Sequence, residues 1–320
     1  MTDPRSYATP PLARYAVDRA AHRRTDAEWL ARAWDTAEVL VVDVAAGGQA
    51  LVREPGNGAG TAALVLLPSA QCPPVAAERR LFLGEAADGS ALFAVDAPLP
   101  ALPGTRAANL RDVGHLLADR DAGLLTTAVA LAGWHAGHGF SSVTGAPTDP
   151  VQGGWARVDP AGAQVWPRTD PAIIVLVHDG VAGPAGRCLL GRNAGWGGRP
   201  GARRFSCLAG FVEPGESAEA AVAREVREEV GVALADIAYV GSQAWPFPGS
   251  LMLGFEAYAD PLSPVRVDEE EIVEARWFTR REIGAVYADE RVDLGDGDAL
   301  LLPMNVSIAS YLIARWWRGD

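Results

Sequence analysis

The chain has 320 residues, of which 49% are hydrophobic, and its 28 basic and 40 acidic residues give a net charge of −12. This length accommodates two domains, and the acidic balance argues against electrostatic binding of nucleic acid as the main task. No run approaches the roughly twenty apolar residues that span a membrane, and the N-terminus lacks the apolar core of a secretory signal. Three cysteines outside any C-x-x-C pair indicate a reducing compartment, so we expect a cytoplasmic protein.

The first half of the chain predicts a small α+β domain over residues 25–136, after a loosely ordered lead-in over residues 1–24. Thr25 and Glu28 fit a capping-box pattern that begins a short helix ending near residue 34. Apolar, partly β-branched runs separated by Gly- or Pro-rich turns predict a small mixed sheet, with strands at 39–44, 61–67, 81–83 and 91–95. Helical patterns follow at 110–117 and 122–135.

A glycine-rich linker at residues 137–169 leads into a second domain predicted over residues 170–320. Apolar runs predict its strands at 173–177, 188–191, 205–211, 238–243, 251–258 and 273–278, and a helix closes the chain at 304–317. A Gly- and Arg-rich loop precedes the third strand. Phosphate contact and simple solvation are both open for its four arginines, with solvation favoured: Arg192, Arg199, Arg203 and Arg204.

Residues 210–232, GFVEPGESAEAAVAREVREEVGV, predict a helix with a defined start and end. Ser217 follows a Pro-Gly turn and suits an N-cap, and the residues after it are good helix formers. Gly231 stands where a helix ends in a left-handed residue. One helical row of apolar residues should face the core: Val222, Val226 and Val230.

Three carboxylates of this helix lie on another face. Glu225, Glu228 and Glu229 stand at i, i+3 and i+4, which makes them neighbours. Crowded carboxylates repel one another unless a cation lies between them, and oxygen-only ligands suit Mg²⁺ or Mn²⁺ better than zinc. Either Glu228 or Glu229 is a candidate general base, because a base and a metal ligand both require a carboxylate at this place.

The same stretch resembles the Nudix box, the signature of hydrolases that cut a diphosphate joined to a nucleoside. All nine specified positions are filled in register: Gly210, Glu216, Arg224, Glu225, Val226, Glu228, Glu229, Gly231 and Val232. This agreement disfavours a merely solvated acidic helix face. The resemblance implies an α/β fold, the Nudix α/β/α sandwich with a mixed sheet. It also implies supporting roles for Gly210 and Gly231, and for Arg224 and Glu216 as a pair that braces the loop against the helix.

A second motif lies at residues 242–250, which read SQAWPFPGS. Trp245 and Phe247 offer flat faces for base stacking, and two prolines stiffen the loop. The segment resembles the SQPWPFPxS element of NADH pyrophosphatases, a Nudix subfamily, although Ala244 replaces a proline. The resemblance implies substrate-binding roles for Gln243, Trp245 and Ser250. An ordinary hydrophobic turn is the alternative.

The resemblance to this subfamily extends to the metal site. Residues 271–278, EIVEARWF, look like its EIxEARWF segment, whose first carboxylate completes the metal site. We therefore expect Glu271 to join the three helix glutamates as a ligand of Mg²⁺ or Mn²⁺. Glu274 is the alternative within the same segment.

Further residues of the expected substrate pocket follow from the same resemblance. Phe211 corresponds to an aromatic that stacks on adenine, and Trp166 fills the position of a second stacking aromatic. Residues 307–309 resemble a segment that lines the adenine pocket, which implicates Ala309, and Ala209 joins the set beside the box. A core role remains the alternative for Phe211 and Trp166.

One part of the subfamily pattern is absent. These enzymes carry a zinc ribbon with four cysteines, and here the frame around His138 and Phe140 matches but no ligand position holds a cysteine. Those positions hold Ser141, Thr144, Asp159 and Gly162. A Cys₄ zinc site cannot form from these residues, so we predict a degenerate ribbon without zinc, held by hydrogen bonds and packing. The cysteines present, which we expect to be small buried or partly buried residues, are Cys72, Cys188 and Cys207.

These resemblances imply metal-dependent hydrolysis of NADH, and less readily NAD⁺, to nicotinamide mononucleotide and AMP, with removal of NAD caps from RNA as a related activity. They also imply a homodimer. Three alternatives stay open: a Nudix hydrolase of another nucleoside diphosphate derivative such as ADP-ribose, an enzyme dedicated to RNA decapping, and a non-catalytic ligand sensor. The intact set of box glutamates disfavours the sensor.

Overall fold

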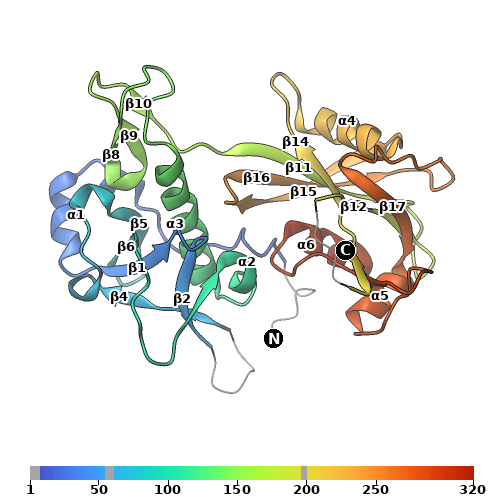
Figure 1. The fold of residues 1–320 in the computed structure, drawn as a ribbon, viewed down its shortest axis with the longest axis horizontal. Coiled ribbons are helices and arrows are strands. Elements are labelled where there is room, and N and C mark those ends of the chain that lie inside the picture. Colours follow the sequence, from blue (N-terminus) through green and yellow to red (C-terminus); the bar gives the residue numbers. More distant parts are fainter. Residues whose placement is uncertain (1–7, 55–60, 196–199) are drawn as a thin grey trace. The chain divides into compact units, whose positions relative to one another are not determined.

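The computed structural model describes residues 8–54, 61–195 and 200–320, and the chain divides into two compact units (Figure 1). Unit 1 comprises Leu12–Thr169 and Ala244–Ser250; unit 2 comprises residues 8–11, Asp170–Gln243 and Leu251–Asp320. Residues 1–7 of the predicted lead-in, and Arg199 of the arginine-rich loop, lie outside the described residues. In the part described, no helix combines the length and the apolar character that crossing a bilayer requires.

Unit 1 is built on a mixed sheet. Its central order is β3-β2-β1-β6-β5, with β4 paired to β1 and β7 paired to β2. The β1–β6 pair is parallel, and the other pairs are antiparallel. The strands are β1 (Glu38–Asp43), β2 (Gln49–Arg53), β3 (Ala63–Leu64), β4 (Leu66–Pro68), β5 (Leu81–Glu85), β6 (Ala91–Asp96) and β7 (Arg106–Asn109).

Helices cover both faces of this sheet, because alternate residues of β1 point to opposite sides. Val39 and Val41 join a core cluster that includes Trp29 and Trp34 of α1 (Ala27–Trp34). Leu40, which lies between the two valines, is fully buried on the other side, where α3 (Asp119–Gly137) contacts β1, β5 and β6. The short α2 (Leu110–Val113) precedes α3, and single 3-10 turns η2 (Ala21–Arg23), η3 (Ser69–Gln71) and η4 (Ala77–Arg79) complete the domain.

Helix α1 begins one residue later than its sequence pattern predicts. Asp26, and not Thr25, is the N-cap, and its carboxylate accepts a hydrogen bond from the Trp29 N–H at 2.8 Å. Both residue types cap helices well, so the sequence alone does not separate them. The lead-in that the sequence predicts to be loosely ordered contains the defined turn η2.

The degenerate ribbon keeps a three-stranded sheet of β8 (Asp149–Val151), β9 (Ala156–Val158) and β10 (Gln164–Val165), with the turn η5 (Gln152–Gly154). The four positions that hold cysteines in the subfamily lie in two turns, one containing Ser141 and Thr144 and the other Asp159 and Gly162. A hydrogen bond links these two turns. The Thr144 hydroxyl donates to Asp159 at 2.6 Å, and the other Asp159 oxygen accepts the Ala163 N–H at 2.8 Å. These bonds, with the Thr144 hydroxyl the strongest, lower the pKa of Asp159. Ser141 accepts the N–H of Thr144, and Gly162 has a left-handed backbone that suits glycine.

Unit 2 contains a six-stranded sheet in the order β15-β16-β11-β12-β17, with β14 paired to β11. A parallel pair, β13 with β18, lies apart from it. The strands are β11 (Asp170–His178), β12 (Arg187–Asn193), β13 (Ala202–Arg204), β14 (Leu208–Phe211), β15 (Ala235–Trp245), β16 (Ser250–Tyr258), β17 (Ile272–Thr279) and β18 (Ala299–Leu301); the helices are α4 (Ala218–Val230), α5 (Arg280–Tyr287) and α6 (Ile308–Arg318).

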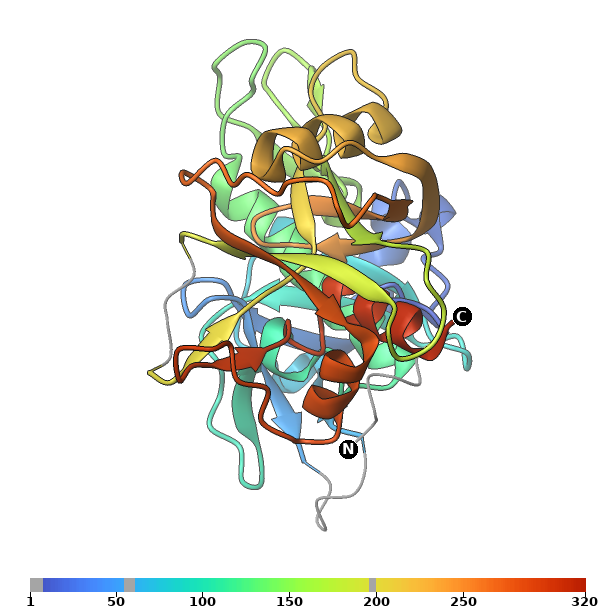
Figure 2. The same cartoon turned by 90° about the vertical axis from the view of Figure 1, so that its right-hand side faces the viewer.

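The sheet of unit 2 is covered on both faces, and β11 shows why. Ile173 and Val175 pack with the valines of α4, whereas Ile174 and Leu176 pack with Leu312 and other residues of α6. Figures 1 and 2 show α4 and α6 on opposite sides of the sheet. A strand buried on both faces reads as a continuous apolar run, which residues 172–177 do. The α/β class and the α/β/α sandwich predicted for this part of the chain are confirmed.

Candidate active site

Helix α4 positions the acidic side chains. The Ser217 hydroxyl accepts a hydrogen bond from the Ala220 N–H at 3.1 Å, which caps the start of the helix. Gly231 ends it at φ 70°, and its N–H donates to the Arg227 carbonyl. Three valines on one row are fully buried, as predicted, and they fix the rotation of the helix: Val222, Val226 and Val230.

With the helix rotated this way, its carboxylates differ in exposure. Glu225 and Glu229 are only 8% and 3% exposed, whereas the Glu228 side chain is 59% exposed. Burial, followed by the charges of Glu225, Glu271 and Asp268, raises the pKa of Glu229 from 4.5 to about 8. One buried oxygen of Glu229, Oε2, accepts no hydrogen bond from the residues described. The burial of the Glu229 carboxylate is therefore only partly compensated by hydrogen bonds.

Glu225 shares this electrostatic environment. Burial raises its pKa, and the charges of Glu228 and Glu271 add to the effect against the opposing Arg224. The four carboxylates predicted as metal ligands therefore act on one another. Gly210 makes room for this arrangement, because a Cβ there would overlap the three carboxylate atoms of Glu225.

Arg224 is the cation within the acidic group. Its Nε and Nη2 donate to the two oxygens of Glu216 at 2.9 and 3.0 Å, which forms the bidentate pair that the sequence predicts. Its Nη1 also donates to Glu225 and Glu228, each at 2.9 Å, and its Nη2 donates to the Phe211 carbonyl. The contact with Glu216 raises the pKa of Arg224 most, and the contacts with Glu228 and Glu225 add to this effect. The arginine thereby ties the loop to the helix.

The residues present fit a divalent cation, although in the described chain no three potential ligand side chains converge on one point. One nitrogen of Arg224 hydrogen bonds both Glu225 and Glu228, at 2.9 Å each. The donor set consists of oxygens alone, as Mg²⁺ and Mn²⁺ prefer. The uncompensated oxygen of Glu229 and the mutual repulsion of the carboxylates are both costs that a cation would relieve.

Four predicted substrate residues belong to unit 2. Phe211, at the end of β14, is 59% exposed and available for stacking. Gln243 is 1% exposed, and its amide nitrogen donates to the Val306 carbonyl at 3.1 Å. Ala309 is buried at the start of α6, and the Ala209 N–H hydrogen bonds to the Glu229 carboxylate. Gln243 thus holds the chain just before α6, close in sequence to Ala309.

The remaining predicted substrate residues belong to unit 1. The rings of Trp245 and Phe247 meet edge to face, with centroids 5.1 Å apart. Ser250 is buried, and Trp166 is exposed. A residue that the sequence did not indicate joins this loop: the Arg111 guanidinium carbon lies 3.9 Å from the Phe247 ring centroid and 5.9 Å from that of Trp245. Its position, far before the loop in the sequence, carries no motif that would reveal the contact.

The two units of the chain match two different protein-family models. Residues 168–299 match the NUDIX domain, and residues 40–134 match the NADH pyrophosphatase-like rudimentary NUDIX domain. The NAD-capped RNA hydrolase NudC of Mycobacterium tuberculosis is 42% identical over 315 residues, which cover 97% of this chain and 95% of that protein. The chain belongs to the Nudix hydrolase family.

Other relatives of this Nudix hydrolase match smaller parts of it. The human NAD-capped RNA hydrolase NUDT12 is 37% identical over 213 residues, covering 63% of this chain and 43% of that protein. The solved NUDIX hydrolase of Nitrosomonas europaea is 27% identical, with a TM-score of 0.29 over 40% of this chain and 83% of its own.

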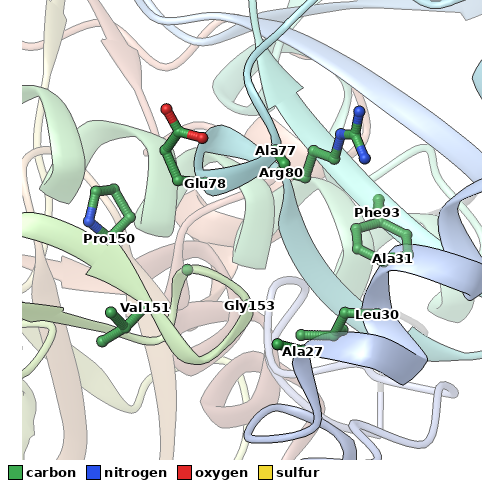
Figure 3. A pocket seen from close by; sticks show the side chains of 11 residues that line it. Ala27, Leu30, Ala31, Ala77, Glu78, Arg80, Phe93, Pro150, Val151 and Gly153 are labelled. Carbon is green, nitrogen blue, oxygen red and sulfur yellow. The ribbon is translucent and has the colours of Figure 1, made fainter.

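Unit 1 of this Nudix hydrolase also contains a cavity of about 230 Å³ (Figure 3). Leu30, Phe93 and Val151 line it, with Glu78 and Arg80 supplying its charged groups. Ligand pockets usually measure about 300–1,000 Å³, and none of the predicted site residues contributes to this one.

Proposed function

We propose that this Nudix hydrolase splits the diphosphate of NADH and NAD⁺ into nicotinamide mononucleotide and AMP, and that it removes NAD caps from RNA 5′ ends. The observation that carries the proposal is Glu229, a buried carboxylate with one oxygen that no described residue hydrogen bonds. It belongs to a complete Nudix box and interacts with the charges of Glu225 and Glu271. The relatives named NAD-capped RNA hydrolases support the choice of substrate.

Glu225, Glu228, Glu229 and Glu271 would hold Mg²⁺ or Mn²⁺, with no zinc in the protein. Such an ion, when bound, neutralises charge on the diphosphate and lowers the pKa of water. Arg224 hydrogen bonds both Glu225 and Glu228 at 2.9 Å and thereby holds these two side chains in place.

Glu228 is our choice for the general base. Its carboxylate is exposed to solvent, where it can take a proton from the attacking water, whereas Glu225 and Glu229 are buried. The two buried glutamates, with Glu271, are then better suited to holding the ion. Arg224 hydrogen bonds Glu228 at 2.9 Å and orients it.

The loop at residues 244–250 supports binding of a dinucleotide. Trp245 and Phe247 provide aromatic faces for stacking, which contributes about 1–3 kcal/mol per base. Arg111 sits against Phe247 and supplies a cation beside these rings, as an anionic substrate of an acidic protein requires. Phe211 of unit 2 and Trp166 of unit 1, both exposed, are the other proposed stacking residues. The further residues that we propose to contact substrate are Gln243, Ser250, Ala209 and Ala309.

The setting proposed for this enzyme is the cytoplasm, where it acts as a homodimer. Its three cysteines are free, as a reducing compartment favours. Burial raises the pKa of the Cys188 and Cys207 thiols, so both are unreactive core residues.

A comparison of substrates tests the proposal. Hydrolysis of NADH, NAD⁺, ADP-ribose and NAD-capped RNA is measured with Mg²⁺ or Mn²⁺ and with a chelator. We expect cleavage of NADH and of the capped RNA that depends on the metal and that Glu228→Gln reduces about a hundredfold. ADP-ribose as the strongly preferred substrate, or full activity in the chelator, would contradict it.

A further inference from the structure

Two arginines near the start of unit 1 share one indole ring. The guanidinium carbon of Arg24 lies 3.6 Å from the ring centroid of Trp155, and that of Arg19 lies 5.4 Å from the same centroid. Arg19 also lies 4.8 Å from the ring of Tyr15. Both arginines are within the distance at which a cation and an aromatic ring attract each other.

This arginine pair, Arg19 and Arg24, has no carboxylate partner among the described residues. The intervening Arg23 differs, because it forms an ion pair with Glu85 at 3.2 Å. Arg24 Nε is buried and donates no hydrogen bond in the described chain. Burial, followed by the charge of Arg19, lowers the pKa of Arg24. Two like charges held side by side, neither of them in an ion pair with a described carboxylate, form an arrangement that an anion would stabilise.

The backbone holds the pair in place. The Trp155 Nε1–H donates to the Phe82 carbonyl at 2.7 Å and fixes the ring. Ala20 adopts the left-handed region at φ 40°, and the Asp18 carboxylate accepts its N–H at 2.8 Å. The turn also lies tightly against β5, since a Cβ on Gly84 would overlap the Asp18 carbonyl oxygen. The arginines are therefore preorganised and lose little freedom when they bind.

The geometry suits phosphate. A guanidinium that packs over an aromatic ring can still donate its outward N–H groups to phosphate oxygens. The chain has no lysine, so all 28 of its basic residues are arginines, and its net charge of −12 repels polyanions elsewhere. An RNA substrate must then meet uncompensated arginines to bind.

We propose that the arginine pair binds the phosphodiester backbone of the RNA that carries the cap. This rests on the proposed function, of which it specifies the RNA-binding surface. An acidic surface of a second copy of the chain is the competing partner, and the experiment below distinguishes the two.

The test compares the wild type with Arg19→Gln/Arg24→Gln. Binding of a single-stranded RNA of about 20 nucleotides without a cap, and kcat/KM for NAD-capped RNA and for NADH, are measured between about 50 and 200 mM salt. Each phosphate contact on a single strand contributes about 0.7 to the steepness of a plot of log affinity against log salt. The variant removes two such contacts, so its slope should be shallower by about 1.4. Over this fourfold salt range, wild-type RNA affinity changes about sevenfold more than that of the variant. NADH hydrolysis is unchanged.

Two control variants show whether a change in the salt slope of RNA binding comes from the arginine pair itself. Arg32→Gln/Arg53→Gln removes the same charge from exposed positions of unit 1 and should leave the salt slope as in the wild type. Arg19→Lys/Arg24→Lys keeps the charge and should retain most of the slope, which a purely structural role for the arginines would not produce.

Several results would overturn the proposal. The first is a salt slope for RNA binding that is equal in the wild type and in Arg19→Gln/Arg24→Gln. The second is an equal loss of activity on NADH and on capped RNA in this variant. The third is a dimer that this variant dissociates, as measured by light scattering, while RNA binding stays intact. Failure of the wild type to cleave NADH would instead refute the proposed function, while uncapped-RNA binding still reports on the arginine pair.

Discussion

Glu229→Gln is expected to stabilise the metal-free protein while it abolishes activity. Glu229 is 3% exposed, and its pKa is raised from 4.5 to about 8. A carboxyl group whose pKa is higher in the folded state than in the unfolded state destabilises the fold. This cost is absent below pH 4.5, grows as the pH rises and levels off above about pH 8. At about 1.36 kcal/mol per pH unit, it amounts to about 1 kcal/mol at about pH 5.5, about 3 at about pH 7 and about 5 at about pH 8.5.

Glutamine removes the charge and keeps an oxygen that can accept the Ala209 N–H, so the variant should recover this free energy. Urea unfolding in a chelator at the three pH values measures it, with Glu219→Gln, an exposed position of the same helix, as the control that changes little. Mn²⁺ should stabilise the wild type and not Glu229→Gln. A variant less stable than the wild type at neutral pH in the chelator, or a stability difference independent of pH, would refute the reasoning.

Three further changes test other parts of the structure. Gly210→Ala should lower kcat at least about tenfold with little effect on folding, because its Cβ displaces the Glu225 carboxylate; kcat equal to that of the wild type would contradict the packing. Trp245→Ala should raise KM for NADH about tenfold with a smaller effect on kcat, as the loss of one stacked base predicts, and an unchanged KM would exclude the stacking role. Asp159→Asn should lower the unfolding free energy at neutral pH and match the wild type in acid, because a lowered pKa stabilises the fold only above the folded value. Thr144→Val should also lower the unfolding free energy at neutral pH. Elemental analysis that finds one zinc per chain would refute the prediction of a zinc-free ribbon.

The sequence predicted the strands that form continuous apolar runs, such as β1, β6 and β11, and the helix whose apolar residues lie on one row. Helix α4 has a clear N-cap, a glycine end and a buried valine row, so its bounds could be predicted closely. Strands β2 and β7 were not predicted, because Gln49–Arg53 is short and Arg106–Asn109 is rich in alanine and partly exposed; backbone pairing with neighbouring strands determines both. Helix α5 was missed although Thr279 and Glu282 form a capping box that signals its start.

The candidate site was predictable where one helix carries it. The spacing of Glu225 and Glu229 shows that they share a face, but their burial, and the exposure of Glu228, depend on how the sheet packs against α4. The contacts of Arg111 with Phe247 and of Gln243 with Val306 join segments far apart in sequence, so no local pattern encodes them.

The most direct test of the central claim is the product analysis of NADH incubated with the purified protein and Mn²⁺ in ¹⁸O-labelled water. Cleavage of the diphosphate by water predicts reduced nicotinamide mononucleotide and AMP in equal amounts, with one labelled oxygen in one of the two phosphates, and no products in the chelator. NADH that remains intact with Mg²⁺ and Mn²⁺ alike, or products cut outside the diphosphate, would contradict the account.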